Sequence, residues 1–243
     1  MNAVTASAQH RAFAPLAGPA SLTDQVVESV RRAILHGDLA PGRLYSAYQL
    51  ADELGISRSP VREALLRLAE TGMVRLERNR GFRVVVPEAR EIAEIFHLRL
   101  LLEVPAVGRV AATASPALVE ALRDELAEMR TAAAVHDETL FMRHDQRLHD
   151  LILTASGNTR LAAHIGGLRD LTRLLGASTV DRSRTLEDIG AEHEPIVAAI
   201  AAGDPDAART AMAAHITHTG RLLVAQAVAG DADPEALWAS VVG

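Results

Sequence analysis

Residues 50–65, which read LADELGISRSPVREAL, restrict the fold of this chain more than any other segment. Apolar residues recur at helical spacing before Gly55, which interrupts the pattern. Ser57 is a suitable N-cap for a second helix, and Pro60 lies in the first turn of that helix, where a missing N–H costs no hydrogen bond. Two helices joined by a short turn that contains glycine form a helix-turn-helix. We therefore expect this motif near the N-terminus.

The flanking segments extend this motif to a small domain. Residues 21–24 open an earlier helix with Ser and Thr as candidate caps. Residues 73–77 and 82–86 alternate or run apolar like short strands, and the turn-forming residues 78–81 join them. The order helix, helix, turn, helix, hairpin predicts a winged helix-turn-helix domain over residues 21–87.

The rest of the chain has only helical periodicity. Aromatic residues make up 3% of the sequence, so Leu, Val, Ile and Ala must build the core, which favours close-packed helices. We expect helices at about 88–113 (broken near Pro105), 116–134, 137–155, 159–176, 185–202 and 205–229. The predicted fold class is mainly α: a winged helix-turn-helix domain, then an all-α bundle over residues 88–230 for effector binding and dimerisation. Residues 1–20 are expected to be a flexible tail, and residues 231–243 a C-terminal tail or last short helix.

Charge divides the chain in the same place. The net charge is -6, but residues 21–87 hold ten Arg and eight acidic residues, a net of +2, and residues 88–243 hold 14 Arg and 23 acidic residues, a net of -9. A basic front domain suits contact with phosphate. The chain has no cysteine, no apolar run long enough to span a membrane and no signal peptide pattern, so we expect a cytoplasmic protein without membrane contact.

Arginine and serine side chains cluster at the start of the second helix of the motif. Arg58 and Arg62 are four residues apart and so share one helix face, where they could reach guanine edges or phosphates. Serine hydroxyls and a helix N-terminus suit phosphate oxygens. The alternative is that these arginines only solvate a surface helix, but the following arginine-tipped hairpin favours DNA binding. The predicted DNA-binding residues are Ser57, Arg58, Ser59, Arg62, Arg80 and Gly81.

Residues 21–87 resemble the N-terminal domain of GntR-family transcriptional regulators. The resemblance rests on Leu50-Ala51, the run from Leu54 to Leu65, Leu68, Gly72 and Asn79-Arg80-Gly81. It implies that Arg58 and Arg62 contact operator DNA. The chain departs from the family at Tyr48, where many members carry an arginine.

Histidine and aspartate lie on core-facing stripes of three predicted helices. Asp145 and His149 share one helix, and His193 and His215 lie on two others. Imidazole and carboxylate are ligands for a divalent ion, Zn in first place with Ni or Mn as alternatives. The other interpretation is three core histidines that each have a separate hydrogen-bond partner. The residues alone leave these two interpretations about equally weighted.

Residues 88–229 resemble the FCD domain of the FadR-like GntR subgroup. The resemblance rests on residues 95–99 with Leu102-Glu103, then 145–149, 155–158, 192–193 and 213–215. It implies that Asp145, His149, His193 and His215 bind a metal and that Arg99 lies near a pocket for small carboxylates. Arg99 and Asn158 are the predicted ligand-binding residues; the competing roles are a salt bridge to Glu103 for Arg99 and a helix N-cap for Asn158.

These observations predict a regulator rather than an enzyme. We expect a homodimer that binds double-stranded operator DNA, most simply a repressor released by a small organic acid bound at the metal site. The alternatives are a metal-dependent hydrolytic enzyme and a DNA-binding protein whose helical domain only dimerises. The sequence does not identify the effector, the metal or the operator.

Overall fold

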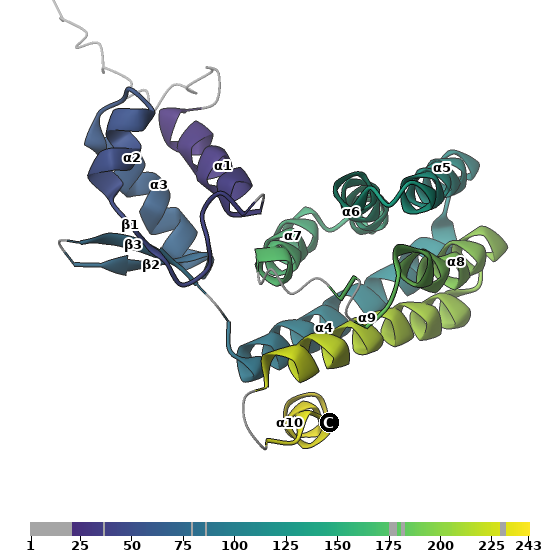
Figure 1. Ribbon diagram of the computed structural model, residues 1–243. Coiled ribbons are helices and arrows are strands. Elements are labelled where there is room, and N and C mark those ends of the chain that lie inside the picture. The colour runs from purple at the N-terminus through teal and green to yellow at the C-terminus, as the bar shows by residue number, and fades with distance from the viewer. Residues whose placement is uncertain are drawn as a thin grey trace, which may run out of the picture.

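A computed structural model describes residues 21–35, 37–78, 80–85, 87–174, 179–180, 183–228 and 232–243. The chain forms a small head of three helices and a sheet, followed by a larger helical domain (Figure 1). This confirms the predicted mainly α fold class. The expected N-terminal tail, residues 1–20, lies outside the described residues.

The head contains the predicted helix-turn-helix and wing. Its elements are α1 (Leu22–Leu35), β1 (Leu44–Tyr45), α2 (Ala47–Glu53), α3 (Arg58–Glu70), β2 (Val74–Glu77) and β3 (Gly81–Val84). The sheet order is β1-β3-β2, with antiparallel pairs. Strand β1 was not predicted, because two residues are too few to produce an alternating pattern.

Apolar residues from the helices and the sheet of the head pack into one core. Val30 of α1, Leu65 of α3 and Phe82 of β3 are among its buried members. Tyr45 stacks on Phe82 with ring centroids 5.7 Å apart, and its hydroxyl accepts a hydrogen bond from the backbone N–H of Ala40. The short strand β1 is therefore fixed by its aromatic residue as well as by its pairing with β3.

The wing turn depends on Gly81. Its φ is +122°, a region that side-chain-bearing residues rarely adopt. A Cβ at this position would overlap the carbonyl oxygen of Tyr45 on the neighbouring strand. Glycine therefore lets β3 approach β1 closely next to the wing turn.

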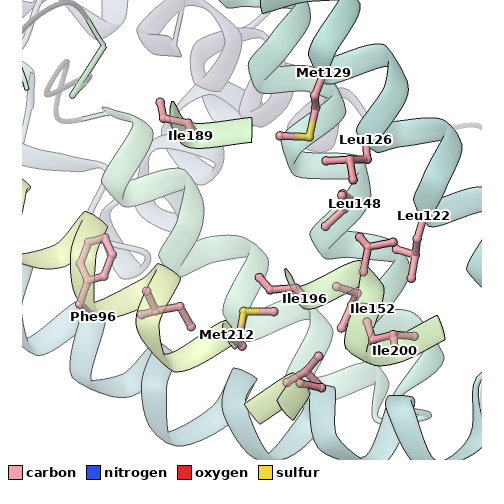
Figure 2. Close-up of a cluster of buried hydrophobic side chains, with 14 of the residues drawn as sticks. Phe96, Leu122, Leu126, Met129, Leu148, Ile152, Ile189, Ile196, Ile200 and Met212 are labelled. Carbon is pink, nitrogen blue, oxygen red and sulfur yellow. The ribbon is translucent and has the colours of Figure 1, made fainter. Parts of the chain in front are cut away.

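The helical domain is a bundle in which α4 and α9 run side by side, with α10 on one side of this pair and α5, α6 and α7 on the other (Figure 1). Its helices are α4 (Ala89–Thr113), α5 (Pro116–Ala134), α6 (Glu138–Ala155), α7 (Thr159–Leu174), α8 (Leu186–Ala202), α9 (Pro205–Ala227) and α10 (Pro234–Val242). Figure 2 shows aliphatic side chains such as Leu148, Ile196 and Met212 gathered between these helices. None of the helices in the described part of the chain is both long and apolar enough to cross a membrane.

One feature of the bundle differs from what the sequence suggested, and a second goes beyond it. Helix α4 continues through Pro105, where we expected a break. Proline removes one backbone hydrogen bond, but Pro105 and the preceding turn at Leu101 are exposed, so water can replace that bond. Within the segment expected to be a tail or short helix, α10 packs against α4 and α9 through buried Trp238. Trp238 lies against Gly220 of α9, where a side chain would leave no space for the indole.

Candidate metal centre and DNA-facing surface

The predicted DNA-binding residues of α3 lie on the surface of the head. Ser57, Arg58, Ser59 and Arg62 are all exposed. Ser57 takes the N-cap position of α3, but its hydroxyl makes no capping hydrogen bond. Both the hydroxyl and the first N–H groups of α3 are therefore available to an anion such as a phosphate.

The wing exposes one further predicted cation. Arg80 is exposed in the turn before β3, and Gly81 begins that strand. Asn79, which helped to identify the wing in the sequence, lies outside the described residues. By contrast, Arg67 on α3 pairs with Asp24 and Glu63, so not every arginine of this helix is available to a ligand.

Three of the predicted metal ligands meet in the centre of the bundle. His149 of α6 and His193 of α8 are fully buried, and His215 of α9 is 6% exposed. One ring nitrogen from each histidine lies within 4.8 Å of the other two. The shortest approach joins Nε2 of His149 to Nε2 of His193, at 3.2 Å.

The Nδ1 atoms of His193 and His215 each face an acceptor, which assigns the tautomers of these two imidazoles. Nδ1 of His193 donates to the carbonyl oxygen of Ile189 at 2.8 Å, and Nδ1 of His215 donates to Glu192 at 2.9 Å. Nδ1 of His149 lies 3.3 Å from a carboxylate oxygen of Glu103 without a hydrogen bond between them, and Nε2 of the same ring is within hydrogen-bond distance of His193. With their protons on Nδ1, the Nε2 atoms of His193 and His215 carry lone pairs. Ligand histidines in metal sites are commonly oriented in this way.

Asp145, the fourth predicted ligand, lies at the edge of this cluster. One carboxylate oxygen is 3.0 Å from Nε2 of His193 and 4.0 Å from Nε2 of His149. The other oxygen accepts a hydrogen bond of 2.6 Å from Arg169 of α7. Asp145 can therefore offer one oxygen to an ion bound by the histidines while Arg169 holds its other oxygen.

Burial keeps two of the imidazoles neutral. It lowers the pKa of His149 to about 3, an effect that the Arg169 charge reinforces, and lowers the pKa of His215 to about 4. Burial alone would raise the pKa of Glu192, but hydrogen bonds from His215 and Arg184 outweigh it and bring that pKa to about 2. At neutral pH His149 and His215 are therefore neutral and Glu192 is ionised, which suits a divalent cation.

The donor set fits a divalent ion. The Nε2 atoms of His149 and His193 are 3.2 Å apart, and a divalent cation bound by both would replace the hydrogen bond that one tautomer forms between them. Ligands about 2.1 Å from one zinc-like ion at tetrahedral to octahedral angles lie about 3.0–3.4 Å apart. The separation between His149 and His193 is within this range. Three histidines and one aspartate are also suitable ligands for nickel or manganese.

The two predicted ligand-binding residues are both engaged in other contacts. Arg99 is 4% exposed, and its Nε donates to Glu103 at 2.6 Å. The side-chain oxygen of Asn158 accepts from the backbone N–H of Leu161 and caps α7 from an exposed position. Arg99 is therefore linked to the cluster through Glu103, whereas Asn158 has the N-cap role that competed with ligand binding in the sequence.

Helix α7 connects the cluster to the head. Arg169 reaches Asp145, and the next residue, Asp170, pairs with Arg31 of α1 at 2.7 Å. Leu171 follows and contributes to the apolar core of the head, where it lies close to Gly72. One turn of α7 thus contacts both the candidate metal site and the domain that carries α3.

Arg169 is the main functional candidate that the sequence analysis missed. It follows buried Ile165 by four residues, so a charged side chain at a core-facing position of α7 was the available signal. Its Nε is buried and has no hydrogen-bond partner among the residues that the structure describes. Glu103 and Glu192, whose carboxylates orient His149 and His215, were visible only as neighbours of the predicted residues.

Comparison with known families identifies both parts of the chain. Residues 22–84 match the family described as bacterial regulatory proteins, gntR family, and residues 94–218 match the FCD domain. An uncharacterized HTH-type transcriptional regulator of Bacillus subtilis is 30% identical over 200 residues, which cover 80% of this chain and 87% of that protein. The probable D-xylose utilization operon transcriptional repressor of Paenarthrobacter nicotinovorans is 30% identical over 198 residues, 81% of this chain and 86% of that repressor.

A solved structure supports the same assignment. The Escherichia coli protein McbR/YncC superposes with a TM-score of 0.74 at 25% identity, over 86% of this chain and 99% of that one. The similarity therefore extends over head and helical domain together.

Proposed function

The chain belongs to the gntR family of bacterial regulatory proteins and carries an FCD domain, and from this premise we propose that it is a repressor released by a small organic acid bound at a metal site. Like its relatives, it is a DNA-binding transcriptional regulator and not an enzyme. The observation that carries the sensory part of the proposal is the pair of buried Nε2 atoms 3.2 Å apart in His149 and His193.

Operator binding is assigned to the exposed end of α3 and the wing. Arg58 and Arg62 would read base edges in the major groove, and Ser57 and Ser59 would hold phosphates. Arg80, with Gly81 shaping the turn, would reach the flanking backbone. The exposure of these side chains supports this assignment.

The metal site is assigned to His149, His193, His215 and Asp145. Their buried oxygen and nitrogen donors support a divalent ion, of which zinc is our first choice and nickel or manganese the alternatives. When bound, such an ion would supply a positive centre for carboxylate oxygens. Glu103, Glu192 and the Ile189 carbonyl would keep the imidazoles in the binding tautomer.

The acidic effector is supported by the second positive group at this site. Within the described part of the chain, Arg169 has a buried Nε without a hydrogen-bond partner, while one of its terminal nitrogens donates to Asp145. An effector carboxylate could form charge-assisted hydrogen bonds with this guanidinium. Because Arg99 is already held by Glu103, we assign the effector-binding role to Arg169 first.

Effector binding would reach the DNA through α7. A change in the contacts of Arg169 would shift the turn of α7 that also carries Asp170, the ion-pair partner of Arg31. Allosteric regulation requires two sites and a structural element that responds to both, and this turn of α7 meets that requirement. The relative from Paenarthrobacter nicotinovorans is named a repressor, which favours release over activation.

A homodimer would provide the two DNA-reading helices that a palindromic operator needs. Leu98 and Leu101 of α4 are 47% and 58% exposed. These two apolar side chains are three residues apart and so share one face of the helix. Such an exposed apolar stripe supports α4 as the dimer contact.

The DNA-reading role is tested with the Arg58→Ala/Arg62→Ala variant. Specific binding to an operator selected from a random duplex library should be lost, while the circular dichroism spectrum and melting temperature stay unchanged. The control variant Arg90→Ala/Arg123→Ala removes the same charge from exposed positions of the helical domain and should retain binding. Unaltered footprints with the first variant would overturn the assignment.

The sensory role is tested by combining metal removal with candidate effectors. A panel of small carboxylates should raise the melting temperature of the zinc-loaded protein and weaken its operator binding. Both effects should disappear after chelation. If operator affinity changes with neither the metal nor the carboxylates, the helical domain serves only for dimerisation.

A further inference from the structure

Tyr48 is the residue at which the head departs from its family resemblance, and its position in the structure gives it a partner. It is the second residue of α2 and is 56% exposed. The neighbouring aromatic Tyr45 packs into the head core, whereas Tyr48 is not part of that core. Packing therefore does not explain a large aromatic ring at this position.

The ring of Tyr48 lies against the guanidinium of Arg58. The Cζ atom of Arg58 is 4.2 Å from the ring centroid, nearer than in the pairs Arg43–Tyr45 (5.5 Å) and Arg99–Phe96 (4.9 Å). Arginine stacks favourably on aromatic faces through cation–π attraction, and contacts within about 6 Å count. The contact joins the first turn of α2 to the first residue of α3.

This contact differs from the ion pairs that hold other arginines of the head. Arg67 is fixed by two carboxylates, which neutralise its charge, and Arg83 pairs with Glu77. In the described part of the chain, Arg58 has no ion pair with a carboxylate. A neutral ring restricts the guanidinium in space but leaves its charge and its planar array of N–H donors for another ligand.

From this geometry, and on the premise that Arg58 binds operator DNA as proposed above, we infer that Tyr48 is a positioning residue for operator specificity. It holds Arg58 in the plane from which the guanidinium forms two hydrogen bonds to one guanine edge. A side chain that is already ordered before binding loses less conformational entropy when it binds. The stacked arginine therefore favours a geometrically defined contact with a base over a loose contact with phosphate.

The residue at position 48 can affect the sequence specificity of DNA binding or its dependence on charge. An arginine at position 48 would add a cation near the phosphates and raise affinity for any sequence. Tyrosine adds no charge, so its effect should appear at the base that Arg58 contacts and not in the dependence of binding on salt.

A double-mutant cycle tests this role. Full-length wild type, Tyr48→Ala, Tyr48→Phe, Arg58→Ala and Tyr48→Ala/Arg58→Ala are titrated against an operator selected by the wild type from random duplexes, against single-base variants of it, and against a non-specific duplex. Tyr48→Ala should weaken operator binding about fivefold, a size typical of a partly exposed cation–π contact. Tyr48→Phe should stay within about twofold of wild type, because the ring is retained.

Two further measurements identify the mechanism. Tyr48→Ala should cost nothing when Arg58 is already alanine, and it should flatten discrimination at the same base pair as Arg58→Ala. Its non-specific affinity and salt slope should match wild type, whereas Tyr48→Arg should increase the magnitude of the salt slope by about 0.9.

Each other outcome counts against a definite part of the argument. Additive losses from Tyr48 and Arg58, or a Tyr48→Phe variant as weak as Tyr48→Ala, would overturn the positioning role. An Arg58→Ala variant that keeps full operator specificity would instead overturn the proposed reading role of Arg58 itself. Melting temperatures monitor folding, and exposed Tyr48 should tolerate all three substitutions.

Discussion

Arg169 and Asp170 are consecutive residues of α7, yet their side chains bind partners in different domains. Arg169 donates to Asp145 beside the three histidines at 2.6 Å, and Asp170 accepts from Arg31 of the head at 2.8 Å. Because adjacent helix residues point about 100° apart, one turn of helix can face both the sensory site and the DNA-binding domain. This relationship links the two halves of the proposed mechanism and leads to the first prediction.

Replacing Asp170 by asparagine should uncouple metal binding from DNA binding. The substitution keeps the shape of the side chain but removes the charge that holds Arg31. The ratio of operator affinities measured with zinc and with chelator should fall towards one, while zinc content is unchanged. Glu194→Gln, which removes an exposed ion pair with Arg130, should keep the wild-type ratio. A wild-type ratio in Asp170→Asn would exclude this route.

Replacing His193 by alanine should abolish stable metal binding. His193 touches both His149 and Asp145, so its loss separates the remaining ligands. Elemental analysis of purified protein should show at least a tenfold fall in bound metal, since losing one of four ligands weakens a site more than losing the groups that orient it. His164→Ala, at an exposed position of α7, is the matched control. Undiminished metal in His193→Ala would mean that the histidines are separate core residues.

Replacing Gly81 by alanine should damage the wing. The new Cβ would overlap the backbone of Tyr45, and its positive φ adds strain of about 1–3 kcal/mol. Denaturant unfolding should show a loss of at least this size, together with weaker operator binding. Gly166→Ala, on an open face of α7, should be neutral or slightly stabilising. Equal stability of the two variants would argue against the close approach of β1 and β3.

Replacing Trp238 by alanine should destabilise the helical domain by about 3–5 kcal/mol. The indole is 3% exposed and fills the space beside Gly220 and Phe96. Unfolding followed by circular dichroism would measure the loss, with Trp238→Phe as a milder control. In the wild type, Trp238 is the single tryptophan, so its fluorescence reports the same transition. Unchanged stability would mean that α10 is not part of the folded core.

Local patterns in the sequence determined the order of the elements and the exposed face of α3. Caps, glycine breaks and apolar spacing act between residues a few positions apart, so they can be found without knowing the tertiary fold. The same patterns identified Asp145 and His149 on one helix face. They failed for β1, which pairs with a strand almost forty residues later, and for α4 at Pro105, where exposure decides the cost of the missing hydrogen bond.

Only the tertiary structure decided which polar groups share a site. That His193 and His215 approach His149, that Glu103 rather than a ligand holds Arg99, and that Arg169 enters the cluster all depend on how separate helices pack. A helical period shows which face a side chain occupies, but not which neighbouring helix covers that face. The distance between two helices, and hence the chemistry between them, is set by the packing of the whole core.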